Sequence, residues 1–80
     1  MRVRVRLFAG MKDRLGAGEI LLEDLPPDAT VADARAAIES RCPGLRGFTA
    51  AAAVNLEYAD ASRRLRDGDE VAFIPPVSGG

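Results

Sequence analysis

Polar and aliphatic residues alternate strictly at the start of the chain. The alternating residues are Arg2, Val3, Arg4, Val5, Arg6 and Leu7. A period of two is typical of a β-strand with one buried face, so the aliphatic set is predicted to lie in the core. The segment Glu19 to Glu23 predicts a second strand. We expect it to form a hairpin with the first strand, through a turn or short helix around Met11 to Leu15.

Helical spacing replaces this alternation in the middle of the chain. Pro26-Pro27-Asp28 interrupts the chain, and Thr30 with Asp33 three residues later is typical of a helix N-terminus. The apolar stripe that follows consists of Val31, Ala34, Ala37 and Ile38. Its spacing predicts a helix with one face in the core, ending at Cys42-Pro43-Gly44.

The second half of the chain predicts two more strands. Ala50 to Asn55 is expected to be a short strand followed by a turn near Asn55-Leu56-Glu57, and Leu65 is expected in the core. Asp67-Gly68 predicts a tight turn before the last strand, Glu70 to Ile74. The order strand, strand, helix, strand, strand predicts an α+β fold of the β-grasp type, with a mixed sheet packed on one main helix. The first and last strands should lie parallel at the sheet centre.

Length and composition exclude several classes of protein. Eighty residues make one domain, predicted as residues 1–76 with a flexible tail of residues 77–80. The 11 Lys and Arg residues nearly balance the 12 Asp and Glu residues, so the total charge does not favour nucleic-acid binding. The N-terminal segment has neither an apolar signal core nor a membrane-spanning stretch, and we expect a cytoplasmic protein.

Histidine is absent from the chain, and Cys42 is the single cysteine. The chain therefore lacks the commonest metal ligand and the usual general base at neutral pH, and Cys42 cannot form an internal disulfide. We expect no metal and no cofactor bound by this chain, and no catalysis by the chain alone.

The last six residues are Pro75-Pro76-Val77-Ser78-Gly79-Gly80. The two prolines lack N–H groups and fix φ, so they are predicted to end the last strand and direct the tail outward. Gly79 and Gly80 have no Cβ and could enter a narrow channel in another protein. We interpret the carboxylate of Gly80 as a group on which a partner acts. The alternative is that a glycine pair falls here by chance.

Three apolar residues are candidates for a partner-binding surface. Strand alternation places Phe8 on the same face as the arginines, and it places Ala72 and Ile74 on the outward face of the last strand, with Val71 and Phe73 inward. Tyr58 could extend a patch formed by Phe8 and Ile74, because clustered exposed apolar groups usually mark a contact surface. The alternative is that loops or strand ends cover each of them.

Two charged groups of residues are interpreted as structural. The arginine stripe could attract phosphate, but no aromatic residues interleave with it, and a solvated strand face is the preferred reading. Asp67, Asp69 and Glu70 could suggest a cation site. Turn formation explains the first of these carboxylates, and successive strand residues point to opposite faces, so a structural role is preferred.

Several segments together resemble one known family. They are the opening strand ending in Leu7-Phe8-Ala9, then Ala53-Val54-Asn55, Leu65 to Phe73, and Pro75 to Gly80. The chain resembles the MoaD family, the small subunits of molybdopterin synthase, within the ThiS/MoaD group of ubiquitin-like sulfur carriers. The likeness covers the whole chain, and its Pro-Pro-Val-Ser-Gly-Gly ending is highly specific.

The resemblance implies a reaction cycle at the C-terminus. Gly80 would be adenylated with ATP by an E1-like adenylyltransferase, MoeB, and converted to a thiocarboxylate. The tail would then enter the large subunit, MoaE, where its sulfur serves to convert cyclic pyranopterin monophosphate to molybdopterin. By position, Gly79 would permit threading, and Phe8, Tyr58 and Ile74 would form the apolar surface that binds partners. The chain would supply sulfur rather than catalytic side chains.

Three other functions share the features described so far. A sulfur carrier for thiazole synthesis would use the same fold and activation chemistry, although its tail usually lacks the Pro-Pro step. A ubiquitin-like protein modifier would join its activated Gly80 to a lysine amine. A plain β-grasp adaptor would bind through the Phe8 face, with no role for its tail.

Overall fold

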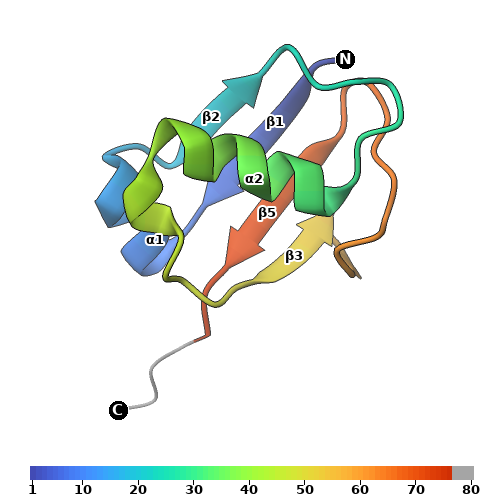
Figure 1. Cartoon of the computed structure of the whole chain (residues 1–80). Helices are drawn as coiled ribbons and strands as arrows, with labels where there is room; N and C mark the ends of the chain where they lie inside the picture. The colour runs from blue at the N-terminus through green and yellow to red at the C-terminus, as the bar shows by residue number, and fades with distance from the viewer. Residues whose placement is uncertain (77–80) are drawn as a thin grey trace.

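The computed structural model describes residues 1–76, in which five strands form one mixed sheet with α2 across one face (Figure 1). The elements in chain order are β1 Val3–Leu7, α1 Ala9–Leu15, β2 Glu19–Leu22, α2 Val31–Arg41, the short 3-10 helix η1 Pro43–Leu45, β3 Ala51–Val54, β4 Glu57–Ala59 and β5 Glu70–Ile74. No helix in the described part of the chain is long and apolar enough to cross a membrane.

The strand order β2-β1-β5-β3-β4 places the first and last strands side by side at the centre. β1 and β5 run parallel, with Val5 opposite Val71 and Leu7 opposite Phe73. The other three strand pairs are antiparallel. A parallel pair needs a long crossover connection, and the segment containing α2 lies within it. The β-grasp arrangement predicted from the sequence is therefore confirmed.

The core lies between the sheet and α2. Its residues include Val3, Val5, Leu7, Met11, Val31, Ala34, Ile38, Leu45, Val54, Leu65, Val71 and Phe73, each exposing 3% or less of its surface. The inward positions of β1 and β5 alternate as predicted, because one face of the sheet is covered and the other is open. Burial of this apolar set is the main favourable term in folding.

The predicted helix start is confirmed by a capping box. The Asp33 N–H donates to the Thr30 hydroxyl oxygen at 3.4 Å, and the Thr30 N–H donates to Asp33 Oδ2 at 2.8 Å. These two bonds satisfy donors that the first helical turn leaves without partners. The helix ends at Arg41, and the Cys42 N–H donates to the Ile38 carbonyl before Pro43 begins η1.

The second half contains one strand more than the sequence predicted. Val54 lies opposite Glu57, so Asn55 and Leu56 form a two-residue hairpin loop between β3 and β4. Both loop residues have positive φ, 49° and 71°, as a type I′ turn requires. The predicted turn is confirmed, but β4 was missed because it has three residues and little apolar pattern. Helix α1 also begins two residues before the predicted Met11.

A polar network fixes the start of β5. The Arg2 N–H donates to Asp67 Oδ1 at 2.6 Å, and the Gly68 N–H donates to the Arg2 carbonyl at 2.7 Å. The Asn55 side chain donates to Asp69 Oδ1 at 2.9 Å and accepts from the Glu70 N–H at 3.0 Å. This turn network, made by Arg2, Asn55 and residues 67–70, joins β1, the β3–β4 loop and β5. The predicted Asp67-Gly68 turn is thus confirmed, with Gly68 at φ 88°.

Candidate functional site

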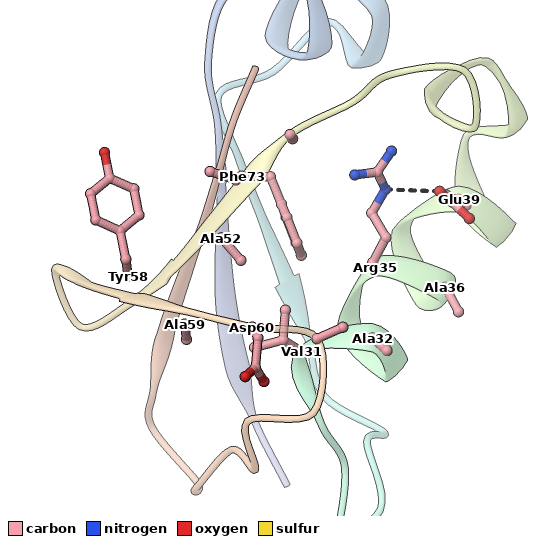
Figure 2. A pocket seen from close by; sticks show the side chains of 13 residues that line it. Val31, Ala32, Arg35, Ala36, Glu39, Ala52, Tyr58, Ala59, Asp60 and Phe73 are labelled. Atoms are coloured by element: carbon pink, nitrogen blue, oxygen red, sulfur yellow. Dashed lines mark hydrogen bonds and ion pairs between the residues drawn. The ribbon is translucent and has the colours of Figure 1, made fainter. Parts of the chain in front are cut away.

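The outer face of the sheet, opposite to α2, carries a row of small side chains at its centre. The register aligns Glu19, Arg6, Ala72, Ala53 and Tyr58 in one row across the five strands. Tyr58 is 78% exposed at the end of this row. Its ring lies on the side of the sheet away from Phe73 and Arg35 (Figure 2). The row thus has alanines on β5 and β3 at its middle, with the longer side chains of β1 and β2 on one side and Tyr58 on the other.

Phe8 and Ile74 lie at the end of the outer face where the chain leaves β5. Phe8 is 37% exposed and is the N-cap of α1. Leu7 and Phe73 are register partners in the parallel pair, and Phe8 and Ile74 are the residues that follow them. Phe8 and Ile74 therefore lie at the same level of the sheet. Ile74 is half-buried and pairs with Ala51 of β3. The structure brings these two predicted surface residues together.

Tyr58 is separated from that pair. It pairs with Ala53, whereas Ile74 pairs with Ala51, so the two side chains stand two strands and two residues apart. With strand spacing near 4.8 Å and a rise near 3.3 Å per residue, their Cα atoms are roughly 12 Å apart. Tyr58 therefore lies on the same face as Phe8 and Ile74 but too far from them to form one small patch.

Ala72 faces outward, as alternation predicts, yet it is only 9% exposed. Its register partners on either side are Arg6 and Ala53, and a methyl group at the centre of a sheet is easily shielded by longer neighbouring side chains. Leu21, opposite Arg4 on this face, is 43% exposed and was not singled out from the sequence.

The arginine stripe is paired with carboxylates of the neighbouring strands. Arg4 contacts Glu19 at 3.4 Å and Glu70 at 3.8 Å, and Arg6 contacts Glu70 at 3.7 Å. The Arg6 guanidinium also lies 5.7 Å from the centre of the Phe8 ring. The arginines and Glu19 are half-exposed and Glu70 remains in part accessible to water, so each ion pair contributes little to stability. The reading of a solvated strand face is confirmed.

The other charged candidates have structural partners. Asp67 and Asp69 belong to the turn network, and Glu70 pairs with the arginines of β1. In residues 1–76 no group of His, Cys, Asp and Glu side chains is arranged to hold a metal ion. Cys42 is half-buried at the end of α2, with its sulfur 3.9 Å from the Arg14 carbonyl.

One carboxylate outside these groups has a perturbed pKa. The Ser62 hydroxyl donates to Asp60 Oδ1 at 2.6 Å, and the Ser62 N–H donates to the same oxygen at 3.0 Å. These bonds to the ionised form hold the pKa of Asp60 below its ordinary value. The loop that it organises accepts hydrogen bonds from the first turn of α2 through the Ala61 and Arg63 carbonyls.

The chain leaves the sheet beside an apolar groove. Pro75 is half-buried and Pro76 is exposed. Both line a groove of about 450 Å³ together with Ala9, Gly10, Gly47, Phe48 and Thr49. Gly80, predicted to react, and Gly79, predicted to permit threading, lie outside the described residues. The groove was not foreseen, because Gly10 of α1 and Phe48 of the loop after η1 come together only in the folded chain.

A second cavity, of about 420 Å³, lies between α2 and the β3–β4 hairpin (Figure 2). Alanines of both elements form much of its wall, and Arg35 and Glu39 of α2 meet there at 2.8 Å. Sequence reasoning missed Arg35 as well, since a single arginine on a helix carries no signal of its tertiary contacts.

A model of the ThiS family matches residues 5–80. The chain belongs to the ThiS family. A molybdopterin synthase sulfur carrier subunit from Chlamydomonas reinhardtii is 38% identical over the full length of both chains. A protein of the same name from Phaeosphaeria nodorum is 41% identical over 69 residues, which cover 72% of each chain. The predicted family is thus confirmed.

Solved structures of similar chains share the fold. SAMP1 from Haloferax volcanii matches with a TM-score of 0.90 at 32% identity, over 100% of both chains. A second structure, of the small archaeal modifier protein 1 from the same organism, matches with a TM-score of 0.87 at 30% identity, covering 95% of this ThiS-family chain and 98% of the other. A chain in the complex of subunits 1 and 2 of the molybdopterin-converting factor from Helicobacter pylori matches with a TM-score of 0.70 at 30% identity, over 100% of both chains.

Proposed function

We propose that this chain is the sulfur carrier subunit of molybdopterin synthase. The observation that carries the proposal is the full-length similarity to a protein of that name. The fold supports it, because β5 ends at Ile74 and releases the chain beside the exposed ring of Phe8. A partner that binds the outer face would therefore have the tail within its reach.

The chemistry takes place at the carboxylate of Gly80. This carboxylate attacks the α-phosphorus of ATP on an E1-like adenylyltransferase, MoeB, and pyrophosphate leaves. Sulfide then attacks the acyl carbon, AMP leaves, and loss of the remaining proton gives a thiocarboxylate. Adenylation is needed because a carboxylate oxygen is a poor leaving group, and the thiocarboxylate is ionised at neutral pH. Gly79 permits entry into a narrow active site, since it has no Cβ.

The partner that receives the sulfur is the large subunit, MoaE. The Helicobacter pylori complex of subunits 1 and 2 supports a partner of this kind. Phe8 and Ile74 provide the apolar contact, with Tyr58 as a separate contact farther along the outer face. MoaE would use the thiocarboxylate sulfur to convert cyclic pyranopterin monophosphate to molybdopterin. The chain would act in the cytoplasm and bind no cofactor itself, because ATP is used by the activating enzyme.

Intact-mass measurement tests the proposal. The full chain is incubated with ATP, the adenylyltransferase of its own organism and a sulfide source. We expect a mass gain equal to the exchange of one oxygen for sulfur, located at Gly80 by fragmentation. Omission of ATP is the control and should leave the mass unchanged. An unmodified mass in the complete reaction would contradict the proposed function.

A second candidate is a ubiquitin-like protein modifier. The match to the small archaeal modifier protein 1 favours it, because that protein is named for modification. In this case the activated Gly80 acyl group would form an isopeptide bond with a lysine amine. Incubation with ATP and extract of its own organism, followed by mass spectrometry of tryptic peptides, would show lysines that carry residues 67–80 if this reaction occurs, because Arg66 is the last site at which trypsin cleaves before Gly80.

A further inference from the structure

The Arg35 side chain joins three separate parts of the molecule. From α2, its Nε donates to Glu39 Oε2 at 2.8 Å. Its Nη2 donates to the carbonyl oxygens of Leu45, at 3.2 Å, and Phe48. The guanidinium carbon lies 5.7 Å from the centre of the Phe73 ring, so Arg35 also faces β5 (Figure 2).

These contacts involve both the N–H donors and the planar face of the guanidinium group. One part of its planar fork meets a carboxylate, another meets two backbone carbonyls, and its face is turned to an aromatic ring. The Arg35 side chain is only 20% exposed. Its contacts tie the loop after η1 to α2, and the backbone of that loop adds a bond from the Phe48 N–H to the Leu45 carbonyl at 3.2 Å.

Two residues that Arg35 contacts, Phe48 and Phe73, lie near the point where the chain leaves the sheet. Phe73 lies in β5, two residues before Pro75. Phe48 lines the apolar groove that Pro75 and Pro76 also line. The Phe48 ring also lies close to Gly10, where an added Cβ would be only 2.8 Å from the ring atom Cε1.

We propose that Arg35 is a positioning residue for the C-terminal tail, acting through Phe48 and Phe73. By fixing the wall of the groove and the end of β5, it restricts the directions in which the chain departs after Pro76. This inference rests on the proposed function, since a set direction matters for a tail that must enter a partner's active site. If the tail points in the binding-competent direction for a smaller fraction of the time, its apparent affinity for the partner falls in proportion to that fraction.

The first experiment measures tail direction without any reaction. Ser78→Cys carries a fluorescent label, in a Cys42→Ser background, and time-resolved anisotropy gives the angular range of the label. Arg35→Met keeps an unbranched aliphatic side chain but removes the charge and all donors. We expect it to widen the angular range. Arg41→Met is the matched control, because Arg41 lies on the same helix and donates to the Leu21 carbonyl, and neither residue lines the groove.

Gly10→Ala separates positioning from stability. The added methyl must displace the Phe48 ring, while alanine is favoured over glycine within a helix such as α1. We expect the fold to be as stable as before and the angular range of the label to widen. Arg35→Lys keeps the charge with fewer donors and should fall between the wild type and Arg35→Met. An angular range unchanged in both Arg35→Met and Gly10→Ala, with both proteins folded, would overturn the proposal.

The second experiment is the kinetic counterpart. ATP–pyrophosphate exchange by the adenylyltransferase is measured against carrier concentration, at a temperature where every variant is folded. We expect Arg35→Met and Gly10→Ala to raise the KM for the carrier about three- to tenfold with kcat unchanged, and Arg41→Met to change neither. A fall in kcat with constant KM would overturn the positioning role. Failure of the wild type to support exchange would contradict the proposed function instead, and the anisotropy result would still decide the role of Arg35.

Discussion

The two ends of β5 are held by different kinds of contact. At its start, the turn network joins β5 to β1 and to the β3–β4 loop through short hydrogen bonds, among them the bond of 2.6 Å from the Arg2 N–H to Asp67. At its end, Pro75 and Pro76 have no N–H to donate, and the contacts there come from an apolar groove.

The start of β5 therefore serves the stability of the fold, whereas its end serves the reactivity of the tail. Hydrogen bonds with fixed geometry hold the register at the start of β5, so substitutions there should act on folding. The other end can exchange its apolar contacts for those of a partner without breaking any buried hydrogen bond. The carrier can therefore offer its tail to another protein while the sheet stays intact.

The largest effect is expected at the reactive end. Removing Gly80, or adding one residue after it, should abolish the sulfur-dependent mass gain, because the carboxylate would no longer stand at the required place on a glycine pair. Thermal unfolding should stay within about 1 °C of the wild type, since termini bury little surface. Sulfur transfer by the extended variant would contradict the role assigned to Gly80.

The next largest effect is expected in the turn network. Asn55→Ala removes the bonds to Asp69 and Glu70 and places alanine at a positive φ. We expect a loss of about 2–3 kcal/mol in the free energy of unfolding, measured by urea denaturation. Asn55→Gly is the control that loses the bonds without the backbone strain, and it should lose less. A change below about 0.5 kcal/mol in Asn55→Ala would show that the network does not anchor β5.

A smaller effect is expected on the outer face next to the tail. Ile74→Asp, and separately Phe8→Asp, should weaken binding of the large subunit at least about tenfold, measured by calorimetry, because a charge would be buried at an apolar contact. Leu56→Asp is a matched control, since Leu56 is 93% exposed at the opposite end of β3. Equal weakening by all three variants would contradict a localised contact, and unfolding of the first two would show that they are core residues.

The smallest effect is expected from Asp60, which belongs neither to the turn network nor to the lining of the apolar groove. Its pKa in the folded protein lies below the ordinary value. Its contribution to stability is therefore present above the unfolded-state pKa and is lost as the pH falls through the folded-state pKa. Ser62→Ala removes the first-named cause and should raise the pKa of Asp60, which a carbon-detected NMR titration would measure. An unchanged titration midpoint would show that the Ser62 hydroxyl does not stabilise the carboxylate.

The strands and the helix at the centre of the fold could be predicted from the sequence, because their patterns are local. Val3, Val5 and Leu7 alternate with arginines, and Thr30 and Asp33 are three residues apart at a helix start. β3 was harder, since a run of alanines favours a helix by propensity. Pairing with β5 and β4 overrides that preference, and β4 itself forms only because β3 is there to pair with it.

The candidate site could be predicted only in part. Alternation alone placed Phe8 and Ile74 on the outer face, but it could not show that Tyr58 lies two strands away or that Ala72 is shielded. Arg35, Phe48 and Gly10 meet through contacts between residues far apart in the chain. No periodicity or motif in the sequence encodes such contacts, so they become visible only in three dimensions.

The parallel pairing of β1 with β5 has a consequence for biosynthesis. The middle of the sheet joins residues 3–7 to residues 70–74, so a ribosome must have translated nearly all of these 80 residues before the nascent chain can close its core. Such high contact order slows folding relative to helical bundles of similar size. A product truncated before β5 would lack the central strand pair, and quality-control proteases would meet it as an unfolded chain.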